Sequence, residues 1–260
     1  MTVKGNLYTV KILTYIGEMA RKSEVARLRV RRAANNVATS RAARKQSAPR
    51  GSRASEATPY HHGALHDALL EAAERVLERD GLAGLTLRAV AREAGVSHAA
   101  PTHHFGDLTG LVSELAAIGF RQFNTAMELA DAAGNSPIEK ALAGAKAYVA
   151  YAQAHPGMYG LMFRAERLDM TRPSLHEAAS AAFAGLAGAV GARRHEQISE
   201  QAFSLEQAAA IARAWSLVHG FTTLLLDGRL SDILRRLPKG TDAEALLDAM
   251  LKLTVGRPGT

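Results

Sequence analysis

The chain contains no cysteine among its 260 residues. Disulfide bonds, thiolate metal sites and cysteine nucleophiles are therefore excluded. The sequence also shows no uninterrupted apolar run of about 18 residues, so we expect no transmembrane helix. The segment "LTYIG" near the start is too short for the apolar region of a signal peptide. A cytoplasmic protein with no membrane partner fits these absences best.

The common signatures of catalysis are absent too. We find no Gly-rich phosphate-binding loop, no nucleophile elbow and no His-Glu-x-x-His pattern. We therefore expect a protein that is not an enzyme and uses no cofactor. A helical enzyme without a familiar motif remains an alternative, although nothing in the chain indicates what its substrate would be.

Acidic residues are scarce in one part of the chain only. Residues 1–59 hold 13 of the 32 Lys and Arg residues and 3 of the 25 acidic residues, which leaves 19 basic and 22 acidic residues in the remainder. A basic arm on a slightly acidic body suggests a polyanionic partner. A membrane surface would favour larger apolar residues than the Ala, Ser, Asn and Arg of residues 20–59, so nucleic acid is the preferred partner.

Strand patterns are nearly absent, and the chain beyond residue 59 predicts an all-α fold. The first helix, "ALHDALLEAAERVLERDG", should end at Gly81. Thr86, Ser97, Ser136, Ser204 and Thr241 stand where side chains cap helix N-termini. A longer helix should follow Asp107 and run to about Ala133, and Pro156 and Pro173 should separate later helices. These are ordinary helix lengths, and they predict roughly nine helices.

We expect three parts: a basic arm over 1–59, a three-helix helix-turn-helix domain over 60–106, and a helical effector-binding and dimerisation domain over 107–260. The arm is Pro-, Gly- and Ser-rich near its end, which indicates a linker. Met19 is an internal methionine, and translation could begin there instead.

The stretch "LTLRAVAREAGVSHAAPTHHFGD", residues 85–107, predicts two helices joined by a tight turn. Gly95 allows the positive φ that such a turn needs. Leu87, Val90, Ala91 and Ala94 share one helix face, which should pack inward. The second helix would then present its polar start to a major groove of DNA.

The wider segment "LHDALLEAAERVLERDGLAGLTLRAVAREAGVSHAAPTHHFGDLTGLVSEL" resembles the DNA-binding domain of TetR-type transcriptional regulators, without a gap over residues 65–115. "AWSLVHGFTTLLLDGRL" resembles the Trp-His-Gly segment of one C-terminal subfamily, through Trp215, His219 and Gly220. The resemblance implies a homodimeric repressor that binds a palindromic double-stranded operator and responds to a small-molecule effector.

The resemblance also implies the DNA-binding residues. Thr86 and Arg88 stand where the family contacts phosphates, and His98 and Ala99 where it reads bases. The full set is Thr86, Arg88, Ser97, His98, Ala99, Thr102, His103 and His104. In two places the chain departs from the family pattern: Thr102 replaces a tyrosine, and Leu108 replaces a lysine that grips phosphate. The basic arm could compensate for the lost positive charge.

Two sets of residues have both a structural and a functional interpretation. The histidines at 61, 62 and 66 could ligate a metal, but no acidic set completes a site, so we expect no metal. His103 and His104 could be packing or surface residues, but their position in the motif favours contact with phosphate. The aromatic residues and methionines of the body are mostly core residues, yet an apolar effector pocket among them is expected. Its candidate lining is Phe123, Met127, Tyr148, Tyr151, His155, Met162, Trp215 and His219.

Two further expectations concern assembly and function. The helices around 204–228 and 241–255 are apolar over most of their circumference, which predicts that they form a four-helix dimer interface. The alternative function is a protein that coats DNA without reading its sequence through the basic arm. The complete helix-turn-helix argues against this alternative.

Overall fold

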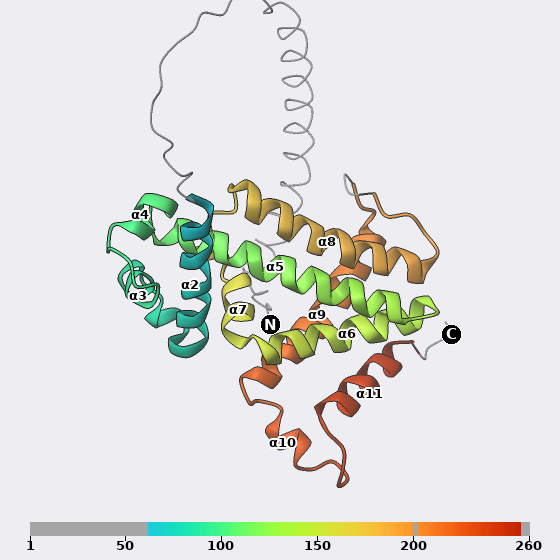
Figure 1. Cartoon of the computed structure of the whole chain (residues 1–260). Helices are drawn as coiled ribbons and strands as arrows, with labels where there is room; N and C mark the ends of the chain where they lie inside the picture. Colours follow the sequence, from blue (N-terminus) through green and yellow to red (C-terminus); the bar gives the residue numbers. More distant parts are fainter. Residues whose placement is uncertain (1–61, 200–201, 256–260) are drawn as a thin grey trace, which may run out of the picture. The chain divides into compact units, whose positions relative to one another are not determined.

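The computed structural model describes residues 62–199 and 202–255, and within these ranges every regular element is helical. The all-α prediction is confirmed for this part of the chain (Figure 1). Its helices are α2 (His62–Gly84), α3 (Leu87–Glu93), α4 (Ala100–Phe105), α5 (Leu108–Ala133), α6 (Pro137–Ala154), α7 (Pro156–Met162), the short 3-10 helix η1 (Ala165–Arg167), α8 (Pro173–Arg194), α9 (Leu205–Leu226), α10 (Ser231–Leu234) and α11 (Ala243–Val255).

The chain divides into two units, Met1–Asp67 and Ala68–Thr260, and the boundary falls inside α2. The predicted basic arm, including Met19, lies outside the described residues, as does His61. The helices of the second unit are described below. The predicted division between residues 106 and 107 stays a prediction.

Several helix ends follow the local sequence as predicted. The Thr86 hydroxyl accepts a hydrogen bond from the Ala89 amide at 3.1 Å, and the Asp107 carboxylate accepts one from Gly110 at 2.7 Å. Ser204 and Gln207 form a reciprocal capping box at the start of α9. Each cap satisfies an amide that has no partner within its own helix. Gly81 breaks α2 with φ 67°, in line with the predicted end of the first helix.

Two predicted caps are wrong. Ser97 does not cap α4, because the helix starts later, with Ala99 at the N-cap and no side-chain hydrogen bond there. Thr241 does not cap α11; instead, the Asp242 carboxylate accepts from the Ala245 amide at 2.9 Å. In both cases a neighbouring residue starts the helix, and residue type alone does not decide between adjacent candidates.

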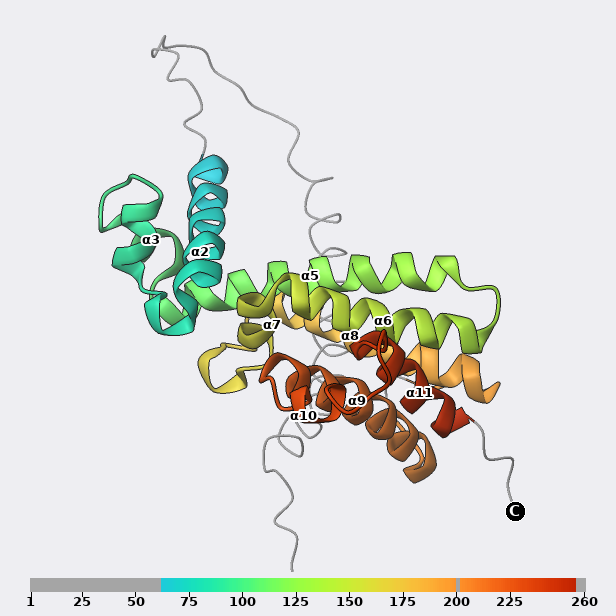
Figure 2. The same ribbon diagram turned by 90° about the horizontal axis from the view of Figure 1, so that it is seen from below.

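The body is built around α5, which packs against α6, α7 and α8 (Figures 1 and 2). The core-facing side of α5 is apolar and includes the fully buried Leu111 and Leu115. Met158 and Leu161 of α7 are fully buried as well. The side chains of α7 therefore pack closely against α5. This packing positions the polar groups described below.

Helix α9 packs on α6 and α8, yet much of its apolar surface stays uncovered. It contains an 18-residue window with mean hydropathy 1.3, of which only 22% is buried, so by length and composition α9 could cross a membrane. This window is not an uninterrupted apolar run, because it contains Arg213 and His219, and one such helix is weak evidence for a membrane span. Length and composition alone do not distinguish a membrane span from a helix that another protein surface covers.

Candidate DNA-reading surface and effector site

The turn between α3 and α4 has the geometry of a helix C-cap. The Val96 amide donates to the Ala91 carbonyl at 3.0 Å, and the Gly95 amide donates to the Arg92 carbonyl at 3.2 Å. Gly95 has φ 69°, which is the left-handed conformation that this paired closure requires. The predicted glycine turn of the helix-turn-helix is therefore present.

The predicted DNA-binding residues face outward from this motif. Val90 and Ala91 of α3 and Pro101 and Phe105 of α4 are buried beneath it. Seven of the predicted residues are exposed and His104 is half-buried; the exposed ones are Thr86, Arg88, Ser97, His98, Ala99, Thr102 and His103. Their roles toward DNA remain predictions, but their exposure makes them available to a duplex.

Ion pairs between charged side chains link helix α3 to α2. Glu93 accepts hydrogen bonds from Arg79 at 2.9 Å and from Arg75 at 3.1 Å. The hydrogen bond from Arg79, followed by the one from Arg75, lowers the pKa of the Glu93 carboxyl below its usual value. The ionised Glu93 carboxylate of α3 therefore binds two arginines of α2.

Glu78 of α2 links the DNA-binding helices to the body. Its carboxylate accepts hydrogen bonds from the amides of Gly157 and Met158, at 3.3 and 3.1 Å. These amides belong to the first turn of α7, where backbone donors have no partner within the helix and the helix dipole favours a negative charge. A movement of α7 would therefore act on α2.

In the body, a polar centre forms where α6, α7 and α9 meet. The Nδ1 atom of His219 lies 2.8 Å from the Tyr148 hydroxyl and 2.9 Å from the Tyr159 hydroxyl. The two hydroxyl oxygens are 3.4 Å apart. Phe163 packs against the His219 ring with centroids 4.7 Å apart, and Trp215 lies 6.3 Å away. We call Tyr148, Tyr159, Phe163, Trp215 and His219 the aromatic centre.

Burial keeps the polar groups of this centre uncharged. Desolvation lowers the pKa of the His219 imidazole and raises the pKa values of the Tyr148 and Tyr159 hydroxyls. One neutral nitrogen faces two hydroxyls, and its single in-plane position can form only one strong hydrogen bond at a time. The centre is therefore a neutral hydrogen-bonding group surrounded by aromatic rings, which suits a polar group on an otherwise apolar ligand.

Four of the other predicted effector residues connect to this centre through contacts that begin at Tyr148; they are Phe123, Tyr151, His155 and Met162. Phe123 packs on Tyr148 and Tyr151, with ring centroids 5.1 and 5.5 Å apart. Tyr151 points its hydroxyl at the Gly119 carbonyl, 3.0 Å away, and its ring lies 5.1 Å from that of His155. Met162 is buried, with its sulfur 3.8 Å from the Tyr151 hydroxyl, whereas Met127 is half-buried on α5.

The sequence did not single out Tyr159 and Phe163 as effector residues. Both lie on or just after α7, behind the break at Pro156, so helical spacing from Tyr148 and Tyr151 does not predict where their side chains point. The available signal was the concentration of aromatic residues itself.

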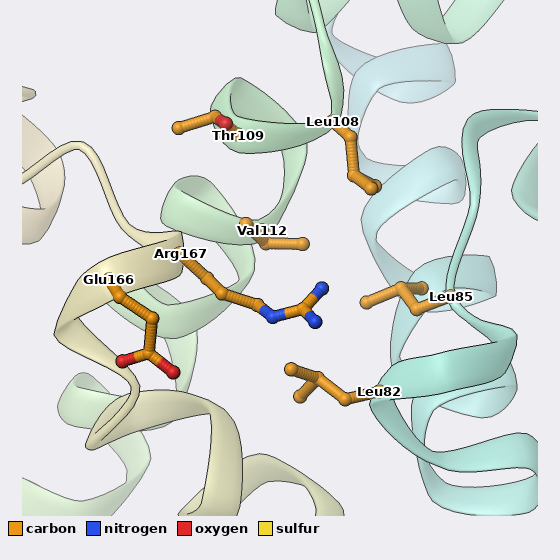
Figure 3. Close-up of a pocket in the computed structure, with 7 residues that line it drawn as sticks. All are labelled: Leu82, Leu85, Leu108, Thr109, Val112, Glu166 and Arg167. Carbon is orange, nitrogen blue, oxygen red and sulfur yellow. The ribbon is translucent and has the colours of Figure 1, made fainter.

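A separate pocket, with a volume of about 180 Å³, lies between the end of α2, the start of α5 and η1. Figure 3 shows the Arg167 guanidinium pointing toward Leu82 and Leu85. Leu108, which stands in place of the expected lysine, forms part of the apolar wall together with Val112. The pocket is smaller than the roughly 300–1,000 Å³ typical of ligand sites, so it can hold only a small molecule or part of one.

Metal-binding side chains do not gather in the described part of the chain, where no group of three or more His, Asp and Glu residues could hold an ion. His61 and the side chain of His62 lie outside this description.

Comparison with known proteins gives matches over most of the described chain. Residues 69–115 match the family description "Bacterial regulatory proteins, tetR family", and residues 141–253 match "Tetracyclin repressor-like, C-terminal domain". An uncharacterized HTH-type transcriptional regulator of Mycobacterium tuberculosis is 28% identical over 192 residues, which cover 73% of this chain and 80% of that protein.

Two solved structures extend the comparison. A Rhodococcus sp. RHA1 protein of unknown function is 34% identical with a TM-score of 0.60, over 75% of this chain and 96% of that chain. The transcriptional regulator FadR from Bacillus subtilis, in complex with stearoyl-CoA, is 17% identical with a TM-score of 0.54, over 74% of this chain and 98% of that chain. The second likeness is one of fold.

An exposed polar helix-turn-helix joined to a helical body defines a DNA-binding regulator of transcription. The chain belongs to the TetR family of transcriptional regulators, as the sequence resemblance predicted. The likeness to the Trp-His-Gly subfamily stays a prediction.

Proposed function

We propose that the protein is a cytoplasmic, homodimeric repressor that binds a palindromic operator and leaves it when a small apolar or amphipathic effector binds. The observation that carries the proposal is the exposed polar turn and α4 in a TetR-family helix-turn-helix. His98 and Ala99 would read base edges, and Thr86, Arg88 and His103 would contact phosphates.

Helices α9 and α11 supply the dimer interface in this proposal. Leu205 and Leu224 of α9 are 81% and 42% exposed, and Leu253 of α11 is 80% exposed. Apolar side chains this exposed on two helices favour burial against a second surface. In a DNA-binding regulator, a second copy of the chain is the partner that best explains these exposed side chains. A dimer carries two helix-turn-helix motifs, which match two half-sites about one DNA turn apart.

The aromatic centre is the proposed effector site, with Phe123, Met127, Tyr151, His155 and Met162 around it. The FadR structure with stearoyl-CoA supports the idea that this architecture holds long apolar ligands. The effector's polar group would hydrogen-bond with His219, Tyr148 or Tyr159. Because Tyr159 lies on α7, whose first turn is bound by Glu78, a displaced Tyr159 would move α2. The C-terminal segment through Trp215, His219 and Gly220 would then be a ligand-binding segment of the Trp-His-Gly kind.

The test begins with selection of duplexes from a random-sequence DNA pool by the purified full-length chain, followed by footprinting. We expect a palindrome with two protected half-sites. A flat profile, with every duplex retained equally, would remove the repressor function and favour a DNA-coating protein that acts through the basic arm.

Fatty acids and their CoA thioesters are the first effector probes, and we expect at least one to lower affinity for the selected duplex. Probes that bind without changing DNA affinity would overturn the proposed induction.

A further inference from the structure

Arg172, the residue before α8, makes contact with three separate parts of the chain. Its Nη2 donates to the Phe105 carbonyl at 3.1 Å, and its Nη1 lies 3.4 Å from a Glu114 carboxylate oxygen of α5. Its Nε lies 3.9 Å from the Asp169 carboxylate in the preceding turn. Because the guanidinium is planar and rigid, these directions are fixed relative to one another.

The Phe105 carbonyl is the last one of α4. This helix has only six residues, and its N-cap Ala99 offers no side-chain hydrogen bond. A helix this short is not stable by itself and depends on contacts from outside. A cationic donor at the C-terminal carbonyls satisfies an acceptor without an intrahelical partner and complements the helix dipole. Arg172 therefore supplies α4 with a charged hydrogen-bond donor at its C-terminal end.

Gly110 in the first turn of α5 leaves space for this tie. A Cβ atom built on Gly110 would lie 2.0 Å from the Phe105 carbonyl oxygen and 2.5 Å from Arg172 Nη2. Any other residue at position 110 would therefore separate the guanidinium from the carbonyl. The close approach of α4, α5 and Arg172 therefore requires a residue without a side chain at position 110. The backbone conformation does not itself require glycine, because the φ of Gly110 is not positive.

The segment that carries Arg172 also borders the small pocket. Glu166 and Arg167 of η1 form one wall of that pocket, and Leu108 and Thr109 of α5 form another (Figure 3). The Ser113 hydroxyl of α5 binds the same segment, accepting from the Asp169 amide at 2.8 Å. Residues 165–172 therefore contact both α5 of the body and the DNA-binding helices.

We propose that Arg172 is a positioning residue that holds α4 in its DNA-reading orientation, and that displacement of residues 165–172 releases this hold. The proposal rests on the proposed function for its consequence at the operator. Its structural part concerns α4 alone and can be measured without DNA.

The first measurement is amide hydrogen exchange of the full chain without DNA, for wild type, Arg172→Ala and Arg172→Lys. We expect faster exchange at the α4 amide of His103 and at Gly106, with no change in the buried middle of α2. A lysine has a single ammonium group and does not span both Phe105 and Glu114, so Arg172→Lys should resemble Arg172→Ala. Arg164→Ala is the control, since Arg164 is an exposed arginine directly before this segment.

The second measurement is affinity for the duplex that the wild-type chain selects. A hydrogen bond to a charged group is worth roughly a factor of ten or more, so we expect Kd to rise about tenfold per subunit in both Arg172 variants and to stay unchanged in Arg164→Ala. Wild-type affinity in Arg172→Lys would mean that Arg172 acts through its charge alone, which overturns the proposal. Equal acceleration of exchange in α2, α4 and α5 would also overturn it, because the residue would then only stabilise the domain. If wild type selects no duplex, the proposed function fails, while hydrogen exchange still decides the role of Arg172.

Discussion

His219 is the titratable residue at the middle of the aromatic centre, and its burial makes the stability of the protein depend on pH. Desolvation lowers its pKa from the usual 6.5, so below that pH the unfolded chain binds a proton that the folded chain resists. The contribution of His219 to stability is therefore complete above about pH 6.5 and is lost as the pH falls toward its folded-state pKa. One proton limits this effect to about 1.4 kcal/mol per pH unit.

We expect the free energy of unfolding in urea to decrease from about pH 7 to about pH 5.5, and to decrease less in His219→Gln. The glutamine keeps a hydrogen-bonding group of similar reach beside Tyr148 and Tyr159. His98→Gln serves as the control because His98 is exposed. If the His219→Gln curve runs parallel to that of wild type, His219 is not the residue responsible.

Gly119 lets α5 and α7 approach each other closely. A Cβ atom there would lie 2.7 Å from both Cγ and Sδ of Met158, which is fully buried. Overpacking of this kind costs about 1–3 kcal/mol, which exceeds the roughly 1 kcal/mol that alanine gains over glycine in a helix. We expect Gly119→Ala to lower the free energy of unfolding and shift the urea midpoint downward.

Gly188 provides the matched comparison for Gly119. It lies within α8, is exposed, and a Cβ atom there would meet nothing within 4 Å. Gly188→Ala should therefore raise stability by up to about 1 kcal/mol. Equal stability of the two alanine variants would show that α5 and α7 adjust to the added methyl group, and that their contact is less tight than the structure has it.

The role of a single residue was predictable from the sequence where it depends only on residues a few positions away. Thr86 caps its helix because the acceptor and the amide lie three residues apart, and Gly95 closes a turn that only a positive φ allows. Arg172 and Glu78 were not predictable, because their partners lie 67 and about 80 residues away in sequence. The position of such partners depends on packing, which no local pattern encodes.

At the scale of elements, the apolar helices α9 and α11 lead to a prediction about assembly. The substitutions should be placed at residues that a single chain leaves exposed: Leu224 and Leu253 meet this condition, whereas Leu247 is 1% exposed and lies within the subunit core. A charge at Leu247 would unfold the subunit instead of separating two subunits. We expect Leu224→Glu with Leu253→Glu to give a folded monomer in light scattering.

Leu129→Glu is the control for this experiment. Leu129 lies on α5 and is 68% exposed, so it offers the same change of side chain on a different helix. The dimer should persist in this variant. If the double variant keeps the mass of a dimer, the interface lies elsewhere, and if wild type itself is a monomer, the exposed surface of α9 needs another partner.

Element boundaries followed the sequence where a proline or a capping box marked them. Pro156 and Pro173 are the first residues of α7 and α8, and Ser204 with Gln207 begins α9. The start of α4 was predicted too early because Ser97 looks like a cap, although the turn continues through Ala99. Ala99 offers no side-chain cap, so the start of α4 is not set by a local capping residue, and the buried Pro101 and Phe105 are the contacts that hold the helix in place.

At the scale of the whole molecule, charge is divided between the first 59 residues and the rest. The first 59 residues have a net charge of +10 and the remainder has −3, as follows from 13 basic and 3 acidic residues against 19 basic and 22 acidic. Leu108 stands where the family resemblance implies a lysine that contacts phosphate, and it lies in an apolar pocket wall, so its side chain offers no positive charge at that position. We expect the arm to supply much of the affinity for DNA and little of the specificity. Its basic residues include Arg27, Arg29, Arg31, Arg32, Arg41, Arg44 and Lys45.

Salt dependence measures this contribution directly. Each phosphate that a cation neutralises steepens the fall of log affinity with log salt by about 0.9, so four contacts per subunit predict that deleting residues 1–59 lowers the slope by roughly 3 to 4 per subunit.

The ranking of operator variants should survive the deletion, because His98 and its neighbours remain to read the bases. Removal of residues 1–18 alone should change the slope little, since 11 of the 13 basic residues of 1–59 follow Met19, beginning with Arg21, and remain in place. The decisive comparison is full-length protein against residues 60–260 on the same selected duplex: equal slopes would show that the arm does not contact DNA, whereas a lower slope with a changed ranking would show that it reads bases as well.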